Sequence, residues 1–312
     1  MGKIAFVFPG QGSQTVGMGQ SVADANEKAA EVFKKADEKL GFALTDIIKN
    51  GPQEKLTHTA NAQPALLTVS TAILQVLKDA GITADYTAGH SLGEYSALVA
   101  AGALTFEDAV YAVRKRGEYM DEAFPNGAGA MAAVLGMDRG ALSEAADEIT
   151  KEGETVQLAN LNCPGQIVIS GTAAGIEKAG ALAKERGAKR VLPLQVSGPF
   201  HSKLMEPAAE KFKAVLDHIP IRDAKIPVIA NIDAEPETNA EDIKVKLIRQ
   251  LYSPVLWEDS VVKMISLGVD TFVEVGPGKV LSGLIRKIDR NVKTFAVQDM
   301  ESLEAAVNAL QK

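Results

Sequence analysis

The 312-residue chain, 46% hydrophobic, is long enough to bury a large core, and we expect one large domain with a smaller companion. A formal net charge of −7 argues against a nucleic-acid partner, which usually requires a basic surface. The single cysteine, Cys163, excludes an internal disulfide framework, and the apolar runs are too short for a signal peptide or a membrane span. We therefore expect an unprocessed, cytoplasmic protein that contacts no membrane.

Continuous apolar runs that end in turns alternate with helical patterns along most of the chain. The runs predict strands at residues 4–8, 86–90, 226–232, 271–275 and 294–297. Apolar residues at helical spacing predict helices at 61–79, 106–120, 206–219, 240–251, 280–288 and 302–310. Strands that alternate with helices favour a parallel sheet covered on both faces, so we expect an α/β core.

One block departs from this alternation. It reads as strand 131–135, helix 139–151, strands 155–160 and 166–170, helix 173–186 and strand 190–196. This β-α-β-β-α-β order is the ferredoxin-like arrangement. We therefore expect an α/β-hydrolase-like core catalytic domain of residues 1–128 and 198–312, with a ferredoxin-like small subdomain at 129–197. The segments 126–129 and 197–199 would be its hinges, and the cleft between the domains would bind a ligand.

The stretch AGHSLGE at residues 88–94 contains the nucleophile-elbow pattern G-x-S-x-G, between a predicted strand and a helix predicted at 92–101. Gly89 and Gly93 permit close backbone approach. Ser91 would stand at the helix N-terminus, where free N–H groups favour a developing oxyanion, and the amide of Leu92 would be the first donor. A serine that merely caps an ordinary helix is the alternative.

A serine nucleophile most often uses histidine as its general base, and the chain has four, His58, His90, His201 and His218. His90 is adjacent to Ser91 and should point to the opposite face, as a packed structural histidine. We expect His58 in a polar loop and His218 exposed at a helix C-terminus. His201 lies where the chain returns from the insert to the core and is the candidate base; a loop histidine without a role is the alternative.

A second glycine-rich loop, PGQGSQ at residues 9–14, follows the first predicted strand. It does not fit a dinucleotide fingerprint, because Thr15 stands where the third glycine is required, and no Walker A loop occurs. The loop either supplies a second oxyanion donor, from the N–H of Gln11 or a neighbour, or is a plain tight turn. No metal-ligand cluster is evident, and Cys163 is expected to be a small packed residue.

Seven segments together resemble one enzyme family over essentially the whole chain. They are FVFPGQGSQ (6–14), AGHSLGEYSAL (88–98), RKRGEYM (114–120), ANLNCPGQIVISG (159–171), SGPFHS (197–202), IRQLYSPVLW (248–257) and VEVGPGKVL (273–281). These motifs, at compatible spacing, resemble the malonyl-CoA:acyl carrier protein transacylases, which load malonyl groups for bacterial type II fatty-acid synthesis.

The resemblance implies ping-pong transfer of a malonyl group from coenzyme A, through a malonyl-serine, to the phosphopantetheine thiol of acyl carrier protein. It implies that Ser91 carries the acyl group and that His201 is the general base and acid. The resemblance also implies that Gln11 and Leu92 supply the oxyanion-hole amides and that Arg116 binds the malonyl carboxylate. Gln250 would supply a carbonyl that orients His201. The cleft would be lined by Met131, Asn160, Asn162 and Phe200. Phe200 resembles the malonyl-selective pattern of related polyketide acyltransferase domains. Neither a metal nor a cofactor is implied, and we expect a monomer.

The residues alone leave other functions open. A serine esterase or thioesterase would share Ser91 and His201 and use water as the acceptor, and a non-catalytic acyl- or coenzyme A-binding scaffold would carry an idle serine. Arg116 could be a surface charge on its helix. Whether the acyl group enters fatty-acid or polyketide synthesis is open as well.

An acidic carrier protein would seek a basic surface despite the negative net charge. Two clusters are candidates, and each could instead be an ordinary solvated face. They are Lys184, Arg186, Lys189 and Arg190 on the insert, and Arg286, Lys287 and Arg290 on the core.

Overall fold

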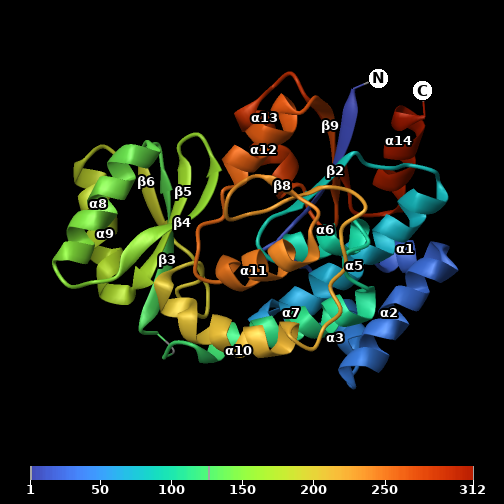
Figure 1. Cartoon of the computed structure of the whole chain (residues 1–312), viewed down its shortest axis with the longest axis horizontal. Coiled ribbons are helices and arrows are strands. Elements are labelled where there is room, and N and C mark those ends of the chain that lie inside the picture. Colours follow the sequence, from blue (N-terminus) through green and yellow to red (C-terminus); the bar gives the residue numbers. More distant parts are fainter. Residues whose placement is uncertain (1, 126, 312) are drawn as a thin grey trace.

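A six-stranded sheet in the order β10-β9-β1-β2-β7-β8 forms the centre of the larger unit in the computed structural model, which describes residues 2–125 and 127–311 (Figure 1). Its strands are β1 (Lys3–Phe8), β2 (Tyr86–Gly89), β7 (Val228–Ile229), β8 (Pro236–Glu237), β9 (Val269–Val275) and β10 (Lys293–Val297). All neighbouring strands pair in parallel except β7 and β8. The predicted parallel α/β core is thereby confirmed.

Helices cover both faces of this sheet, and β1 shows how its sequence permits this. Phe6 and Phe8 pack into one apolar core, with α2 (Glu27–Leu40), α5 (Thr59–Asp79) and α7 (Phe106–Glu122). Ala5 and Val7 pack into another, with α12 (Trp257–Ser266) and α13 (Val280–Ile288). Successive side chains of a strand point to opposite faces, so a continuous apolar run suits a sheet buried on both sides. The helices of the larger unit are α1 (Gln20–Ala25), α2 (Glu27–Leu40), α3 (Leu44–Asn50), α4 (Gln53–Thr57), α5 (Thr59–Asp79), α6 (Gly93–Ala100), α7 (Phe106–Glu122), α10 (Glu206–Leu216), α11 (Ala240–Gln250), α12 (Trp257–Ser266), α13 (Val280–Ile288) and α14 (Met300–Leu310), with the 3-10 turn η1 (Lys203–Met205).

The region between β1 and α5 is more helical than the sequence predicted. Helices α1 to α4 fill it, and α12 was not predicted either. α1, α3 and α4 span 6, 7 and 5 residues, too short to display a helical period. His58 therefore does not lie in a polar loop: it directly precedes α5, at the junction with α4.

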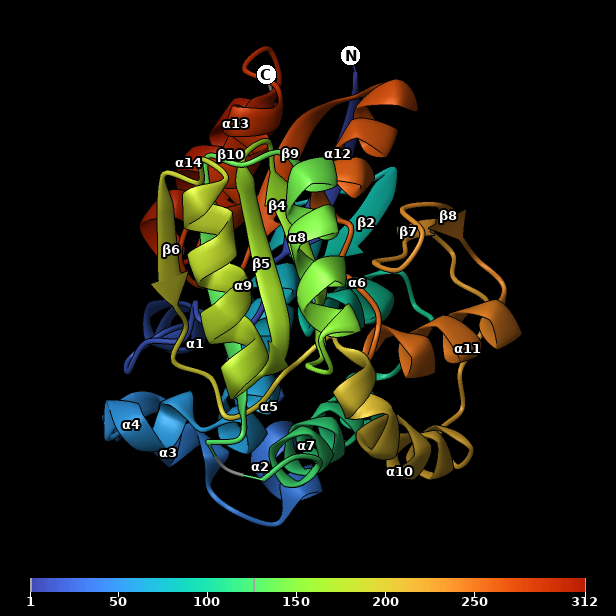
Figure 2. The same ribbon diagram turned by 90° about the vertical axis from the view of Figure 1, so that its left-hand side faces the viewer.

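The smaller unit contains a four-stranded antiparallel sheet in the order β4-β5-β3-β6. It is built from β3 (Gly129–Leu135), α8 (Arg139–Lys151), β4 (Val156–Cys163), β5 (Gln166–Thr172), α9 (Ala173–Glu185) and β6 (Arg190–Pro193). Helices α8 and α9 lie on one face of the sheet and share an apolar core with it (Figure 2). Both the order of the elements and that of the strands are those of the predicted ferredoxin-like arrangement.

Some boundaries differ from those predicted. The strand predicted at 226–232 is reduced to Val228–Ile229, because the chain turns sharply into β8 with Ala234 at φ 56°. The strand predicted at 190–196 ends at Pro193. Residues 1, 126 and 312, which belong to the predicted domain ranges and to the first hinge, lie outside the described residues. Within the described residues, no helix is long and apolar enough to cross a membrane.

Candidate active site

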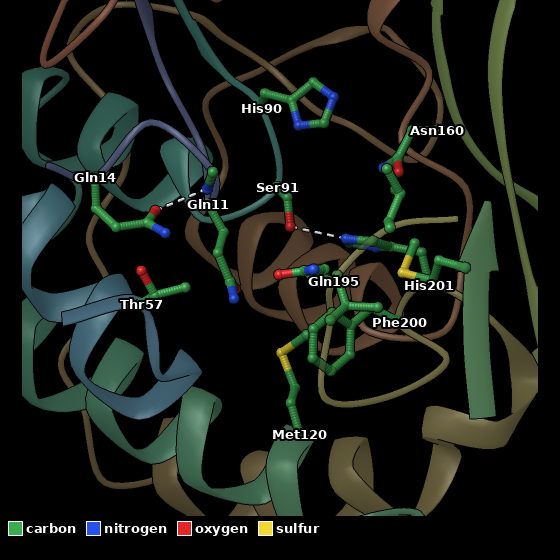
Figure 3. A pocket seen from close by; sticks show the side chains of 14 residues that line it. Gln11, Gln14, Thr57, His90, Ser91, Met120, Asn160, Gln195, Phe200 and His201 are labelled. Atoms are coloured by element: carbon green, nitrogen blue, oxygen red, sulfur yellow. Dashed lines mark hydrogen bonds between the residues drawn. The ribbon is translucent and has the colours of Figure 1, made fainter. Parts of the chain in front are cut away.

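A cavity of about 260 Å³ lies where loops of the larger unit meet the smaller unit (Figure 3). Residues 11, 12 and 14, after β1, line one part of the cavity, and His90 and Ser91, after β2, line another. The other walls come from α4 and α7, from strands β3 and β4, and from the return segment 194–201. The carboxyl ends of parallel strands are a common place for ligands in α/β folds, so the location favours a binding or catalytic role.

The turn between β2 and α6 has the geometry of a nucleophile elbow. Ser91 has φ 51°, a left-handed conformation that is unfavourable for residues with a side chain. A Cβ on Gly89 would lie 1.9 Å from the carbonyl of Gly93, and one on Gly93 would lie 2.1 Å from the carbonyl oxygen of Phe8. Only glycine fits at both positions. Leu92 is the N-cap residue of α6, so its N–H lies at the positive end of the helix.

Ser91 and His201 form a hydrogen-bonded pair, although 110 residues separate them in the sequence. Ser91 Oγ lies 2.8 Å from His201 Nε2 (Figure 3). His201 Nδ1 lies 2.9 Å from the backbone carbonyl oxygen of Gln250. Since a carbonyl can only accept, Nδ1 carries the proton and Nε2 is free to accept one from Ser91. His201 is itself left-handed, at φ 57°.

The environment of His201 keeps its ring neutral. The side chain is 4% exposed, and burial, followed by the positive charge of Arg116, lowers the pKa of His201 to about 3. At neutral pH the imidazole is therefore in the basic form that a proton acceptor needs.

The other three histidines take no part in this pair. His90 Nε2 lies 2.8 Å from Asn162 Oδ1, its ring packs 5.7 Å from that of Trp257, and burial lowers the pKa of His90. The ring lies away from the Ser91–His201 bond, although it contributes to the cavity wall (Figure 3). His58 and His218 are exposed, the latter just beyond the end of α10.

Arg116 is 1% exposed, so its interpretation as a surface charge is wrong. Its Nη2 donates to Ser91 Oγ at 3.1 Å and to Gln250 Oε1 at 2.9 Å, and its Nη1 donates to Gln63 Oε1 at 2.9 Å. All three acceptors are neutral, and Nε has no hydrogen-bond partner. A buried guanidinium without a carboxylate partner beside the serine oxygen favours the binding of an anionic group there.

The remaining predicted residues are placed as follows. Met131, Asn160 and Phe200 line the cavity, as does Gln11, whose side-chain Nε2 donates to Thr59 Oγ1 at 3.1 Å. Asn162 is not among the lining residues, because its side chain is bound to His90. Cys163 is buried, as expected of a packed residue. No group of His, Cys, Asp or Glu that could hold a metal ion occurs in the part of the chain that is described.

Three buried polar residues beside the pair were not predicted from sequence: Gln63, Glu94 and Asn231. Glu94 accepts from the Asn231 N–H at 3.0 Å and from Gln250 Nε2 at 2.9 Å. Burial, and then the charge of Glu237, raises the pKa of Glu94 to about 8. The one available signal was a polar side chain within an apolar stretch, as at Asn231 after residues 226–230.

Comparisons with known proteins agree on one family. Residues 5–308 match the family model of the acyl transferase domain. The chain is 62% identical to the malonyl CoA-acyl carrier protein transacylase of Bacillus subtilis (strain 168), over all of this chain and 98% of that protein. A crystal structure of an acyl carrier protein S-malonyltransferase from Vibrio cholerae is 46% identical, with a TM-score of 0.95 over 97% of this chain and 99% of the other. A malonyl-transacylase in complex with its type II PKS acyl-carrier protein is 43% identical, with a TM-score of 0.96 over 98% and 99%.

Proposed function

Because this chain belongs to the acyl transferase domain family, as a malonyl-CoA:acyl carrier protein transacylase, we propose that Ser91 and His201 carry its malonyl transfer. The observation that carries this assignment is the buried Arg116 guanidinium, 3.1 Å from the oxygen of a serine that is also paired with a neutral histidine. A nucleophile, a base and an anion-binding group thus meet at one oxygen. A malonyl thioester needs all three.

In the first half-reaction, Ser91 Oγ attacks the thioester carbonyl carbon of malonyl-CoA while its proton passes to His201 Nε2. The tetrahedral intermediate then loses the coenzyme A thiolate, which takes the proton from Nε2, and a malonyl ester remains on Ser91. The Gln250 carbonyl accepts from His201 Nδ1 throughout, so it holds the ring in place and stabilises the transient imidazolium.

The oxyanion of that intermediate would be bound by the backbone N–H groups of Leu92 and Gln11. Leu92 stands at the N-terminus of α6, and Gln11 lies in the loop that follows the adjacent strand β1. Each such donor typically stabilises the transition state by about 3–4 kcal/mol in a site that excludes water.

Arg116 would select the acyl group. A planar guanidinium can donate two parallel hydrogen bonds to the free malonyl carboxylate, whereas acetyl-CoA would leave it buried without an anion. Phe200, 5% exposed on the cavity wall, would restrict the space beside the malonyl carbon that carries a methyl group in methylmalonyl-CoA.

In the second half-reaction, the phosphopantetheine thiol of acyl carrier protein accepts the malonyl group from Ser91, in the place that coenzyme A has left. His201 removes the thiol proton, the sulfur attacks the malonyl ester, and Ser91 recovers its proton as it leaves. Both basic clusters predicted above are exposed, and we propose that one of them binds the acidic carrier protein.

The remaining features are proposed on the same basis. The small subdomain would comprise residues 129–197 and the core residues 1–128 and 198–312. The side chains at Ser91 supply every group that the reaction needs, so the proposal includes neither a metal nor a cofactor. The unpaired Cys163 favours the cytoplasm, and the protein would act as a monomer.

Incubation with malonyl-CoA labelled in the acyl group tests the proposal. We expect a stable label on Ser91 that acyl carrier protein discharges. Rapid release of free malonate would support the thioesterase alternative instead, and the absence of label would support the binding scaffold. Parallel incubations with methylmalonyl- and acetyl-CoA measure how strictly malonyl is preferred.

A further inference from the structure

The nucleophile elbow is strained, and its conformation needs a support that the serine itself does not supply. Among the described residues, the non-glycine residues with positive φ are Ser91, His201 and Ala234. The first two form the reactive pair. Ala234 is remote from the reaction, but it closes the tight turn between β7 and β8, in which its N–H donates to the carbonyl oxygen of Ala230 at 2.9 Å. The residue that follows Ala230 in this turn is Asn231.

The side chain of Asn231 spans the elbow. Its Oδ1 accepts from the backbone N–H of Ser91 at 2.8 Å, and its Nδ2 donates to the backbone carbonyl oxygen of Gly89 at 2.6 Å. These two groups lie on either side of His90, immediately before the N–Cα bond of Ser91 that has the left-handed φ. From these contacts we propose that Asn231 is a positioning residue, whose two hydrogen bonds, here called the Asn231 clamp, hold Ser91 in the left-handed conformation that presents its Oγ to His201.

Asn231 is itself rigidly held. It is fully buried, its backbone N–H donates to Glu94 Oε2 at 3.0 Å, and its carbonyl oxygen accepts from the N–H of Leu256 at 2.8 Å. Gln250 Nε2 donates to Asn231 Oδ1 at 3.1 Å and to the Ser91 carbonyl oxygen at 3.0 Å. The same glutamine orients His201 through its backbone carbonyl. The clamp therefore shares one support with the general base.

The clamp differs from the steric contacts at the elbow. Gly89 allows the turn to close on Gly93, and Gly93 allows it to pack against β1, but these close approaches do not fix the φ of Ser91. The Ser91 N–H is satisfied by the Asn231 side chain rather than by a backbone carbonyl. Without Asn231, this amide and the Gly89 carbonyl would lose their buried partners, and the elbow could relax to a conformation that misplaces Oγ.

The inference rests on Ser91 being the acylated nucleophile, so its test includes a probe that does not depend on malonyl recognition. A fluorophosphonate reagent forms an Oγ–phosphorus bond with an activated serine and releases fluoride, and it needs no carboxylate-binding group. For Asn231→Ala we expect labelling of Ser91 to be roughly 10- to 100-fold slower, the range that corresponds to the usual cost of one strained residue. The malonyl-CoA concentration for half-maximal acylation should change far less than the maximal rate.

Asn239→Ala is a matched control. Asn239 is exposed, and it caps α11 by accepting from the N–H groups of Glu241 and Asp242, so its loss also removes two side-chain hydrogen bonds. We expect this variant to lower the melting temperature but to label like the parent. If Asn231→Ala does not fold, Asn231→Asp replaces it. Asp keeps an acceptor for the Ser91 N–H and loses the donor to Gly89, so a smaller decrease in labelling is expected.

Parent-like labelling of a folded Asn231 variant would overturn the inference, as would an equal decrease in Asn239→Ala. A decrease confined to the affinity for malonyl-CoA would overturn it too, because the clamp acts on the nucleophile. A parent that reacts with the fluorophosphonate but not with malonyl-CoA would instead refute the proposed function. The labelling ratio of the two asparagine variants would still test the clamp.

Discussion

The larger and smaller units line the same cavity but contribute different kinds of side chain. The larger unit supplies Ser91 and His201, which line the cavity and are proposed to react, and Arg116, which donates to Ser91 Oγ from behind the lining residues. The smaller unit supplies Met131 and Asn160, which form walls. Ser91 stands at the carboxyl edge of a parallel sheet whose strands are buried on both faces, whereas Arg116 lies on α7 and His201 in the segment that returns from the smaller unit.

The two units also differ in how many ionisable side chains they bury. In the described chain, the buried Arg, His and Glu side chains all belong to the larger unit: Glu94, Arg116, His201, Glu237 and Glu274. The smaller unit is instead stabilised by an apolar core between its sheet and α8 and α9. Burying an ionisable group costs free energy in its charged form, and the lowered pKa of His201 and the raised pKa of Glu94 keep both groups neutral near pH 7. Arg116, beside Ser91, remains the charged group at the proposed site. The smaller unit can then cover the cavity without contributing charge to it.

Removing the base should give the largest effect and would test this division directly. His201→Ala is expected to slow formation of malonyl-Ser91 by roughly 10²- to 10⁴-fold, because Ser91 would lose its proton acceptor. Asn160→Ala, on the wall from the smaller unit, should change the same single-turnover rate only a few-fold. Normal acylation by His201→Ala would exclude the assigned base. An equal loss in both variants would show that the two units do not differ as described.

Removing the Arg116 side chain should have the next largest effect, and it should change the selectivity between malonyl and acetyl groups. Arg116→Ala is expected to lower kcat/KM for malonyl-CoA by roughly 10- to 100-fold, the usual worth of a charge-assisted hydrogen bond, while the ratio of acetyl to malonyl transfer rises. Arg114→Ala is the matched control, since Arg114 lies on the same helix and pairs with Glu118 away from the cavity. Unchanged selectivity in Arg116→Ala would rule out the carboxylate role.

How much of the site the sequence predicted depends on distance along the chain. The Ser91 elbow was predictable because two glycines, a strand and a helix lie within a few residues of it. His201 could be proposed only from its position at a domain return and from a family resemblance, since nothing local to Ser91 points to a residue 110 positions away. Asn231 was missed for the same reason: its contacts arise from the pairing of β2 with β7, which periodicity does not reveal.

The fold shows the same limit. The buried strands and the ferredoxin-like block were predicted because their periods extend over several residues. Short helices such as α3 and α4 were missed, and the strand predicted at 226–232 was too long, because the turn at Ala234 requires a left-handed residue and is not marked by glycine. Local sequence thus predicted most elements with strong patterns, but not all of them: α2, with 14 residues and apolar side chains at helical spacing, was also missed.

The pH dependence of Ser91 reactivity should separate a buried base from an ordinary one. Because the pKa of His201 is lowered to about 3, fluorophosphonate labelling should stay nearly constant from about pH 7 to pH 5. The deprotonated fraction of a base at the usual histidine pKa of about 6.5 would fall roughly 25-fold in that interval. A decrease of that size would show that water or motion of the smaller unit gives His201 a solvated environment.

The pH dependence of the free energy of unfolding should reveal Glu94, the buried carboxyl group near the elbow. The pKa of Glu94 is raised from its unfolded value of 4.5 to about 8, so between these limits the folded state binds more protons than the unfolded state. Glu94 therefore contributes a loss of stability as pH rises from about 4.5 to 8, which His201, with its lowered pKa, opposes below about pH 6.5. Glu94→Gln should flatten this slope in urea unfolding followed at several pH values, and a slope equal to that of the parent would contradict the assignment.

The smallest expected effect concerns which unit binds the carrier protein. Arg190→Glu reverses a charge on the smaller unit, and Lys287→Glu reverses one on the larger; both side chains are exposed. A docking contact at either place should raise the KM for acyl carrier protein a few-fold at low salt, with the difference shrinking as ionic strength screens it, and should leave acylation by malonyl-CoA unchanged. An effect at Arg190 alone would give the smaller unit a role in partner recognition beyond its wall of the cavity. An effect at Lys287 alone would place recognition and chemistry on the same unit, and no effect at either would exclude both basic clusters.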